Sequence, residues 1–137
     1  MFSVHWKGGM AFEADPPSGI RFTMDANPEA GGQGLGPTPI EVLVASVAAC
    51  SAIDVVSILQ KKKQKVTAYR TEIEWERSPQ GTYPRPILSI IVRHVVSGEA
   101  IDPAAVQHAV KLSDAKYCSV IATLRQSPAI TSEYRVE

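Results

Sequence analysis

The residues of this chain best suited to covalent chemistry are its two cysteines, Cys50 and Cys118. Cys50 lies among alanines and serines, and these small neighbours leave room for a reagent to approach the thiol. Cys118 directly precedes a short apolar segment with helical spacing, where the free amides of a helix start can stabilise a thiolate. The alternative interpretation is that both are small buried hydrophobic residues, as most free cysteines are.

The other polar residues indicate chemistry less directly. The histidines, His5, His94 and His108, lack the close spacing of zinc ligands, so the sequence predicts no metal site. The glycine-rich segment 31–36 lacks the Gly-Lys-Ser/Thr ending of a phosphate-binding loop. Asp54 lies in an apolar segment, where a carboxylate is costly unless it is paired or near water. We therefore expect it to meet a buried Arg or Lys, or free backbone amides.

Composition limits the class of protein. The 137 residues include 14 Lys and Arg and 14 Asp and Glu, so the net charge is zero, which argues against a nucleic-acid binder. The length predicts a single domain over residues 1–137. Two cysteines are too few for a disulfide-stabilised secreted scaffold, and the first residues show no signal peptide. We therefore expect a cytoplasmic protein whose thiols start reduced.

The N-terminal part predicts short strands followed by a loop. Alternating apolar residues such as Val4 and Trp6, with the turn signal Gly8-Gly9, indicate a hairpin, and residues 20–24 indicate a third strand. Segment 27–36 contains four glycines and a proline. It is expected to form a flexible surface loop that is neither a helix nor a central strand.

A long helix is expected after this loop. Thr38 can cap its first amides, Pro39 suits the first helical position, and Glu41 can complete a capping box. The body, residues 42–59, is apolar or small on nearly every face, which is typical of a helix that spans a membrane or is buried on all sides. Asp54 argues against the membrane. Because one small chain can cover only part of such a helix, we expect a dimer whose partner covers the rest.

The remaining segments complete the predicted order of elements. They are a strand at 66–77, a more apolar and central strand at 87–96, a helix from Asp102 that bends near Lys116, a further helical turn or two at 118–124, and an edge strand at 129–136. The order is three strands, a helix, two strands, a helix and a strand. This grouping predicts an α+β fold rather than a doubly wound α/β fold.

Three stretches, residues 36–43, 48–56 and 113–119, resemble the OsmC/Ohr family of thiol-dependent peroxidases, and within it the YhfA-type branch rather than Ohr or OsmC proper. The agreement in element order extends the resemblance over essentially the whole chain. It implies an intertwined α+β homodimer, in which two long central helices pack between two sheets. It also implies that two active sites lie at the subunit interface.

The activity that the resemblance implies is reduction of small, chiefly organic, hydroperoxides. Cys50 then corresponds to the peroxidatic cysteine and Cys118 to the resolving cysteine, and an external dithiol, a lipoyl protein in some branches, reduces their disulfide. The family requires no flavin, haem or metal cofactor, and the resemblance implies neither a nucleic-acid nor a membrane partner.

The resemblance is incomplete at the groups that activate the thiol. Ohr-type members pair an arginine with a glutamate near the peroxidatic cysteine, and here Ile40 stands where that glutamate belongs. Glu41, one position later, and Arg21, in the third predicted strand, are the nearest candidates for these roles. The alternative role of Glu41 is the capping box. A second hypothesis is therefore a non-catalytic module on the same dimeric fold that binds a small ligand or senses redox state.

Overall fold

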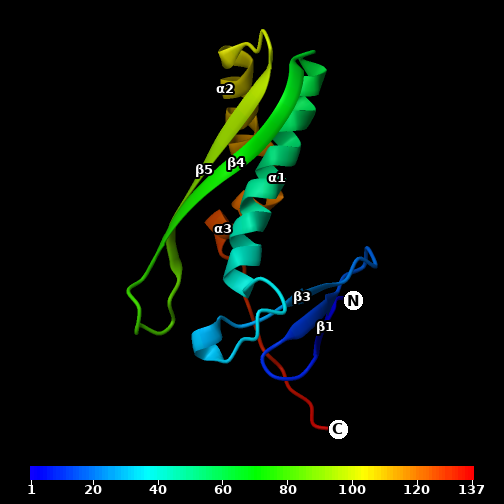
Figure 1. The fold of residues 1–137 in the computed structure, drawn as a ribbon, viewed down its shortest axis with the longest axis vertical. Coiled ribbons are helices and arrows are strands. Elements are labelled where there is room, and N and C mark those ends of the chain that lie inside the picture. The colour runs from blue at the N-terminus through cyan, green and yellow to red at the C-terminus, as the bar shows by residue number, and fades with distance from the viewer. The chain divides into compact units, whose positions relative to one another are not determined.

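A computed structural model describes all of residues 1–137 and divides them into two compact units, Met1–Ala45 and Ser46–Glu137. The long helix α1 (Pro39–Lys61) begins in the first unit and continues through the second (Figure 1).

The first unit is built around a small antiparallel sheet in the order β1-β2-β3. Its strands are β1 (Ser3–Trp6), β2 (Phe12–Asp15) and β3 (Phe22–Met24), as the alternation of apolar residues predicts. The turn between β1 and β2 contains Gly8 and Gly9, both with positive φ, a conformation that glycine adopts without the penalty of a Cβ.

The loop after β3 is organised by one buried carboxylate. Asp25 is 2% exposed and accepts hydrogen bonds from the backbone amides of Ala26, Gln33 and Leu35. The bonds from Gln33 and then Leu35 lower the pKa of this carboxyl, and burial acts weakly in the other direction. The prediction that the segment contains no helix was wrong for one short turn, the 3-10 helix η1 (Pro28–Ala30), because the Asn27 side chain accepts from the Ala30 amide and caps it.

Helix α1 begins as its capping signals predict. The Thr38 amide donates to Glu41 Oε2 at 2.7 Å, and the Glu41 amide donates to Thr38 Oγ1 at 3.3 Å. This reciprocal pair satisfies two amides that a helix start otherwise leaves free. The helix is long and apolar enough to cross a membrane by length and composition, a property that core helices of soluble proteins share.

The second unit packs α1 and a second helix with one long hairpin (Figure 1). Strands β4 (Lys65–Arg77) and β5 (Ile87–Glu99) pair antiparallel, and α2 (Pro103–Leu112) follows. Its core contains Val55 and Leu59 of α1 and Ala105 and Ala109 of α2. Asp102 caps α2 by accepting from the Ala104 amide, as predicted.

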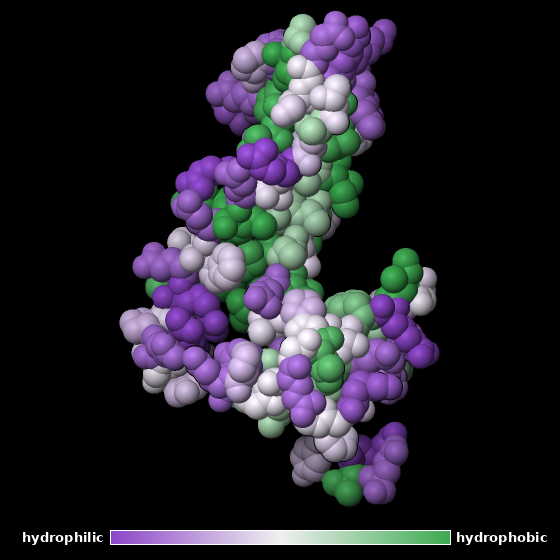
Figure 2. All heavy atoms as spheres, viewed as in Figure 1, coloured by the Kyte–Doolittle hydropathy of each residue, from purple (hydrophilic) through white to green (hydrophobic).

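One prediction about burial is wrong for the single chain, and another is confirmed. Strand β5 was expected to be central, but its sheet has only two strands, so each has one neighbour. Helix α1 was expected to be covered only in part by its own chain, and Ile53 is 69% exposed. Figure 2 shows hydrophobic side chains at the surface along the flank that carries this part of α1. Both α1 and β5 therefore contain more apolar residues than this single chain buries.

The C-terminal part departs once more from the prediction. After α2 the chain forms a π-helical turn, η2 (Ser113–Tyr117), and a short helix, α3 (Ser119–Gln126), in agreement with the expected bend and further helix. The expected edge strand at 129–136 is absent, and Ile130 and Val136 are exposed. Alternation makes a segment fit for a strand, but a strand forms only where a partner strand supplies hydrogen bonds. The α+β class is confirmed, without the last strand.

Candidate functional site

The two cysteines, 68 positions apart in the sequence, come together in the second unit. Cys50 lies half-buried on α1, and Cys118 is 3% exposed at the residue that precedes α3. Both are free thiols. Burial raises the pKa of the Cys118 thiol, and its contact with the Cys50 thiol raises it further. The pair is therefore an accessible thiol in contact with a more protected one.

The turn η2 presents Cys118 at this place. The Cys118 amide donates to the carbonyl of Ser113 at 2.9 Å, which closes a turn one residue wider than an α-helical one. Cys118 then adopts an extended backbone, and α3 starts behind it. The backbone amides of Ile121 and Val120 face its sulfur and lower the thiol pKa, against the larger effect of burial. The prediction that Cys118 lies at a helix start is confirmed.

A chain of polar side chains lies beside the thiols, buried at Ser51 and Ser113 and half-buried at Asp54, His94 and Tyr69. Ser113 Oγ is 3.0 Å from Asp54 Oδ2 and 3.2 Å from Ser51 Oγ, and Ser51 Oγ is 3.3 Å from His94 Nε2. On the other side of the ring, His94 Nδ1 bonds to the Tyr69 hydroxyl. Asp54 thus has a polar partner, as expected, but the partner is a serine hydroxyl and not an Arg, a Lys or a backbone amide.

Burial adjusts the titration of the two aromatic members of this chain. It raises the pKa of Tyr69 to about 12, so the phenol keeps its hydrogen at neutral pH. Burial also lowers the pKa of His94, and the charge of Asp114 opposes this effect. A neutral imidazole carries one N–H, so the ring donates through one nitrogen and accepts at the other.

Sequence reasoning found only Asp54 of this chain. Its other members, Ser51, Tyr69, His94 and Ser113, come from α1, β4, β5 and η2, so no local motif joins them. One signal was available, because Ser51 and Asp54 are polar, three positions apart, and lie in a largely apolar helix. That spacing places them on one face of the helix.

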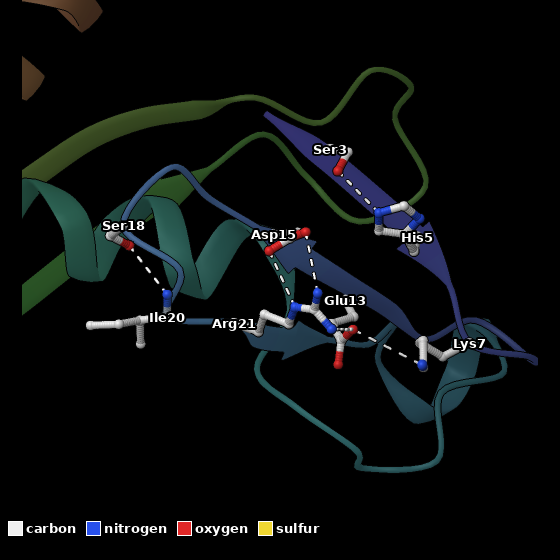
Figure 3. A network of polar contacts seen from close by, with 8 residues as sticks. All are labelled: Ser3, His5, Lys7, Glu13, Asp15, Ser18, Ile20 and Arg21. Carbon is white, nitrogen blue, oxygen red and sulfur yellow. Dashed lines mark hydrogen bonds and ion pairs between the residues drawn. The ribbon is translucent and has the colours of Figure 1, made fainter. Parts of the chain in front are cut away.

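The two candidates for an activating pair have local partners in the first unit. Figure 3 shows the Arg21 guanidinium turned toward Asp15 and Glu13; its Nε is 3.2 Å from Asp15 Oδ1 and its Nη1 is 3.8 Å from Glu13 Oε1. The Glu41 carboxylate accepts from the Thr38 amide in the capping box. Both belong to the unit Met1–Ala45, whereas the cysteines belong to Ser46–Glu137. Their roles at the thiols stay predictions.

The family is decided by comparison with known proteins. The family model described as OsmC-like protein matches residues 31–133, which include both cysteines and the whole polar chain. The chain belongs to the OsmC-like family. Membership is consistent with a soluble protein.

Two relatives and one further protein of the same fold are similar to this OsmC-like protein. Protein YhfA of Escherichia coli K12 is 38% identical over 133 residues, which cover 97% of this chain and 95% of YhfA. A protein solved by structural genomics is 36% identical, with a TM-score of 0.81 over 98% of this chain and 96% of its own. An organic hydroperoxide resistance protein OsmC from Legionella pneumophila shares the fold at 16% identity, with a TM-score of 0.65 over 91% and 88%.

Proposed function

We propose that this OsmC-like protein is a thiol-dependent reductase of small organic hydroperoxides. The observation that carries the proposal is the contact between the half-buried Cys50 and the buried Cys118. Membership of a family that includes hydroperoxide resistance proteins supports it. The difference in exposure favours Cys50 as the thiol that meets the substrate and Cys118 as the thiol that follows.

The reduction of one hydroperoxide balances with these two thiols, which supply both electrons. The Cys50 thiolate attacks the distal oxygen of ROOH, the O–O bond breaks, and the alkoxide takes up a proton and leaves as ROH. Cys50 becomes a sulfenic acid. The Cys118 sulfur then attacks the Cys50 sulfur, water leaves, and a disulfide forms. An external dithiol, for which a lipoyl protein is the proposed carrier, exchanges with the disulfide and restores both thiols.

The pKa of Cys118 favours this order of events. Burial is the largest cause of its upward shift, and a smaller part comes from Cys50, whose sulfur bonds to the hydrogen of the Cys118 thiol and repels a second thiolate. Conversion of the Cys50 thiolate to a neutral sulfenic acid removes that repulsion. Cys118 therefore ionises more readily only after Cys50 has reacted, when its attack is required.

The functional protein is proposed to be a cytoplasmic homodimer. The exposed Ile53 and the surrounding small residues on α1 form an apolar surface that a second copy of the same helix would cover. The uncovered face of the hairpin, with Leu88 at 61% and Ile91 at 49% exposed, adds to the same argument. In such a dimer, the roles predicted for Glu41 and Arg21 could be supplied by either subunit.

One experiment tests the proposed reaction directly. The reduced protein receives one equivalent of cumene hydroperoxide, and its intact mass, its free thiols and the released alcohol are measured. We expect the loss of two hydrogens and of both thiols, with one alcohol formed. The matched variants separate the steps: Cys118→Ser should stop at a sulfenic acid that dimedone traps, and Cys50→Ser should not react. Intact thiols after an hour would refute the proposal.

A second candidate function is a ligand-binding or redox-sensing module without turnover. The observation that favours it is that Arg21 and Glu41 both have partners close in sequence. Arg21 pairs with Asp15 and Glu13, and Glu41 accepts from the Thr38 amide. Such a protein would form the disulfide with a strong oxidant such as diamide, but it would consume peroxide no faster than a free thiol does.

A further inference from the structure

The hydrogens available in the polar chain determine the direction of its hydrogen bonds. Ser113 lies within bonding distance of both Asp54 and Ser51, but its hydroxyl has one hydrogen. Because a carboxylate can only accept, Ser113 donates to Asp54 and accepts from Ser51. His94 Nε2 then donates to Ser51, and Tyr69 donates to His94 Nδ1. Four contacts use four hydrogens, and no buried side-chain polar atom lacks a partner.

Ser113 is the member of this chain that is linked to both cysteines. Its carbonyl accepts from the Cys118 amide at 2.9 Å. Its hydroxyl bonds to Ser51, the residue after Cys50, and to Asp54, one turn further along α1. Ser113 is fully buried, at 0% exposed, so water cannot replace these bonds without a change of packing.

Direct participation in catalysis is excluded for the two serines by their burial. Ser51 is 1% exposed and Ser113 is 0% exposed, so neither hydroxyl can reach a substrate as a nucleophile. The effect of the chain on the thiols must therefore pass through the positions of α1 and η2.

We propose that Ser113 is a positioning residue that sets the separation of the Cys50 and Cys118 sulfurs, and that Ser51, Asp54, His94 and Tyr69 hold it in place. This inference rests on the proposed function, because it concerns the same thiol pair. A disulfide requires Cα atoms no more than about 7 Å apart and β-carbons that face each other, so small shifts of η2 against α1 act on its formation.

The test is the redox equilibrium of the pair with glutathione, in which two protein thiols and GSSG exchange to the protein disulfide and two GSH. The protein is equilibrated at a series of GSH/GSSG ratios, quenched with acid and alkylated. Mass spectrometry then gives the fraction of protein that contains the disulfide. In Ser113→Ala, we expect the equilibrium constant for disulfide formation to fall by about tenfold or more, which corresponds to about 30 mV. A purely structural role would lower the melting temperature and leave this constant unchanged.

The matched control is Thr123→Ala. The Thr123 hydroxyl bonds to the carbonyl of Ser119 at 2.7 Å on α3, close to Cys118 in sequence but outside the polar chain. We expect it to keep the wild-type constant within twofold. If Ser113→Ala does not fold, as judged by circular dichroism, Ser51→Ala is the second variant. It removes the hydrogen bond between Ser51 and Ser113 from the side of α1 and should also lower the equilibrium constant.

The outcomes separate this inference from the proposed function. A wild-type protein that forms no intramolecular disulfide, even with diamide, would refute both. A wild-type protein that forms the disulfide but consumes no peroxide would refute only the peroxidase. If the equilibrium constant for disulfide formation in the folded Ser113 variant equals that of the wild type, the positioning role alone is overturned. If the Ser113 variant is unfolded, the same result in the Ser51 variant overturns it.

Discussion

Two aspartates, one in each unit, organise their surroundings in different ways. Asp25 accepts three backbone amides from residues that are at most ten positions away, and so it shapes one loop. Asp54 accepts from the hydroxyl of Ser113, 59 positions away, and so it joins two elements that each carry or flank a cysteine. A carboxylate bonded to local amides fixes a segment, whereas one bonded to a distant side chain fixes the relation between segments.

This difference assigns separate consequences to the two units. Changes around Asp25 should affect the stability of the first unit and leave the thiol pair unaffected. Changes around Asp54 and Ser113 should instead alter the redox equilibrium of the thiol pair. The loss of a single hydrogen bond costs about 1 kcal/mol, and we expect the change in this equilibrium to be larger.

The largest expected effect is on turnover and belongs to the second unit. Cys50→Ser should reduce peroxide consumption at least about hundredfold, because a hydroxyl at this site is a far weaker nucleophile than a thiolate. Asp25→Asn, which disturbs the loop of the first unit, should keep the turnover of the folded protein within about twofold. The measurement is the initial rate of cumene hydroperoxide loss. Equal losses in the two variants would contradict the separation of the units.

The next effect is on stability and belongs to the first unit. A Cβ on Gly32 would lie 1.6 Å from the carbonyl oxygen of Ala26, so Gly32→Ala must displace the loop that Asp25 holds. We expect a loss of about 3 kcal/mol in the free energy of unfolding, measured with urea.

Gly34→Ala is the matched control for this loop. Gly34 has open space around its Cα but a φ of +71°, so the substitution should cost only the backbone strain of about 1–2 kcal/mol. Equal costs at the two positions would mean that the close approach of Gly32 to Ala26 contributes nothing to stability.

The two units should also respond to acid in different ranges. Burial lowers the pKa of His94 below its ordinary 6.5, so the unfolded chain binds this proton first. The stabilising contribution is therefore complete above pH 6.5 and is lost as the pH falls through the lowered pKa. The backbone amides lower the pKa of Asp25 below 3.8, so its contribution is complete above pH 3.8 and is lost only at lower pH.

Hydrogen exchange resolves this pH dependence by unit. As the pH falls below 6.5, amides of β4 and β5 near Tyr69 and His94 should lose protection, while those of Gln33 and Leu35 keep theirs down to pH 3.8. Groups that face His94 are Tyr69, Ser51 and the charge of Asp114. His94→Gln should abolish the dependence in this range, and the same dependence in that variant would contradict the assignment to His94.

How far the sequence predicted the molecule depended on whether the signals were local. The capping box at Thr38 and Glu41 and the cap at Asp102 predicted two helix starts correctly, because each signal and its partner lie within a few residues. The strand predicted at 129–136 failed because alternation carries no information about a pairing partner.

The candidate site shows the same limit. The two cysteines were identified from their neighbours and the family resemblance, and the structure brings them together. The chain from Tyr69 to Asp54 could not be predicted, because four elements contribute to it and only Asp54 was unusual in its own segment.

The smallest expected effect on stability is at Arg21, which bears directly on the comparison of the two units. Its side chain is 61% exposed and its partners, Asp15 and Glu13, lie at the surface of the first unit. Exposed ion pairs contribute little, so Arg21→Ala should change the free energy of unfolding by at most about 0.5 kcal/mol. If Arg21 serves only these carboxylates, the rate of peroxide consumption stays near that of wild type, and Arg21→Lys behaves alike. A tenfold loss of rate in Arg21→Ala without loss of stability would instead show that the first unit supplies a charge to the thiols of the second. The separation argued from Asp25 and Asp54 would then hold for stability but not for catalysis.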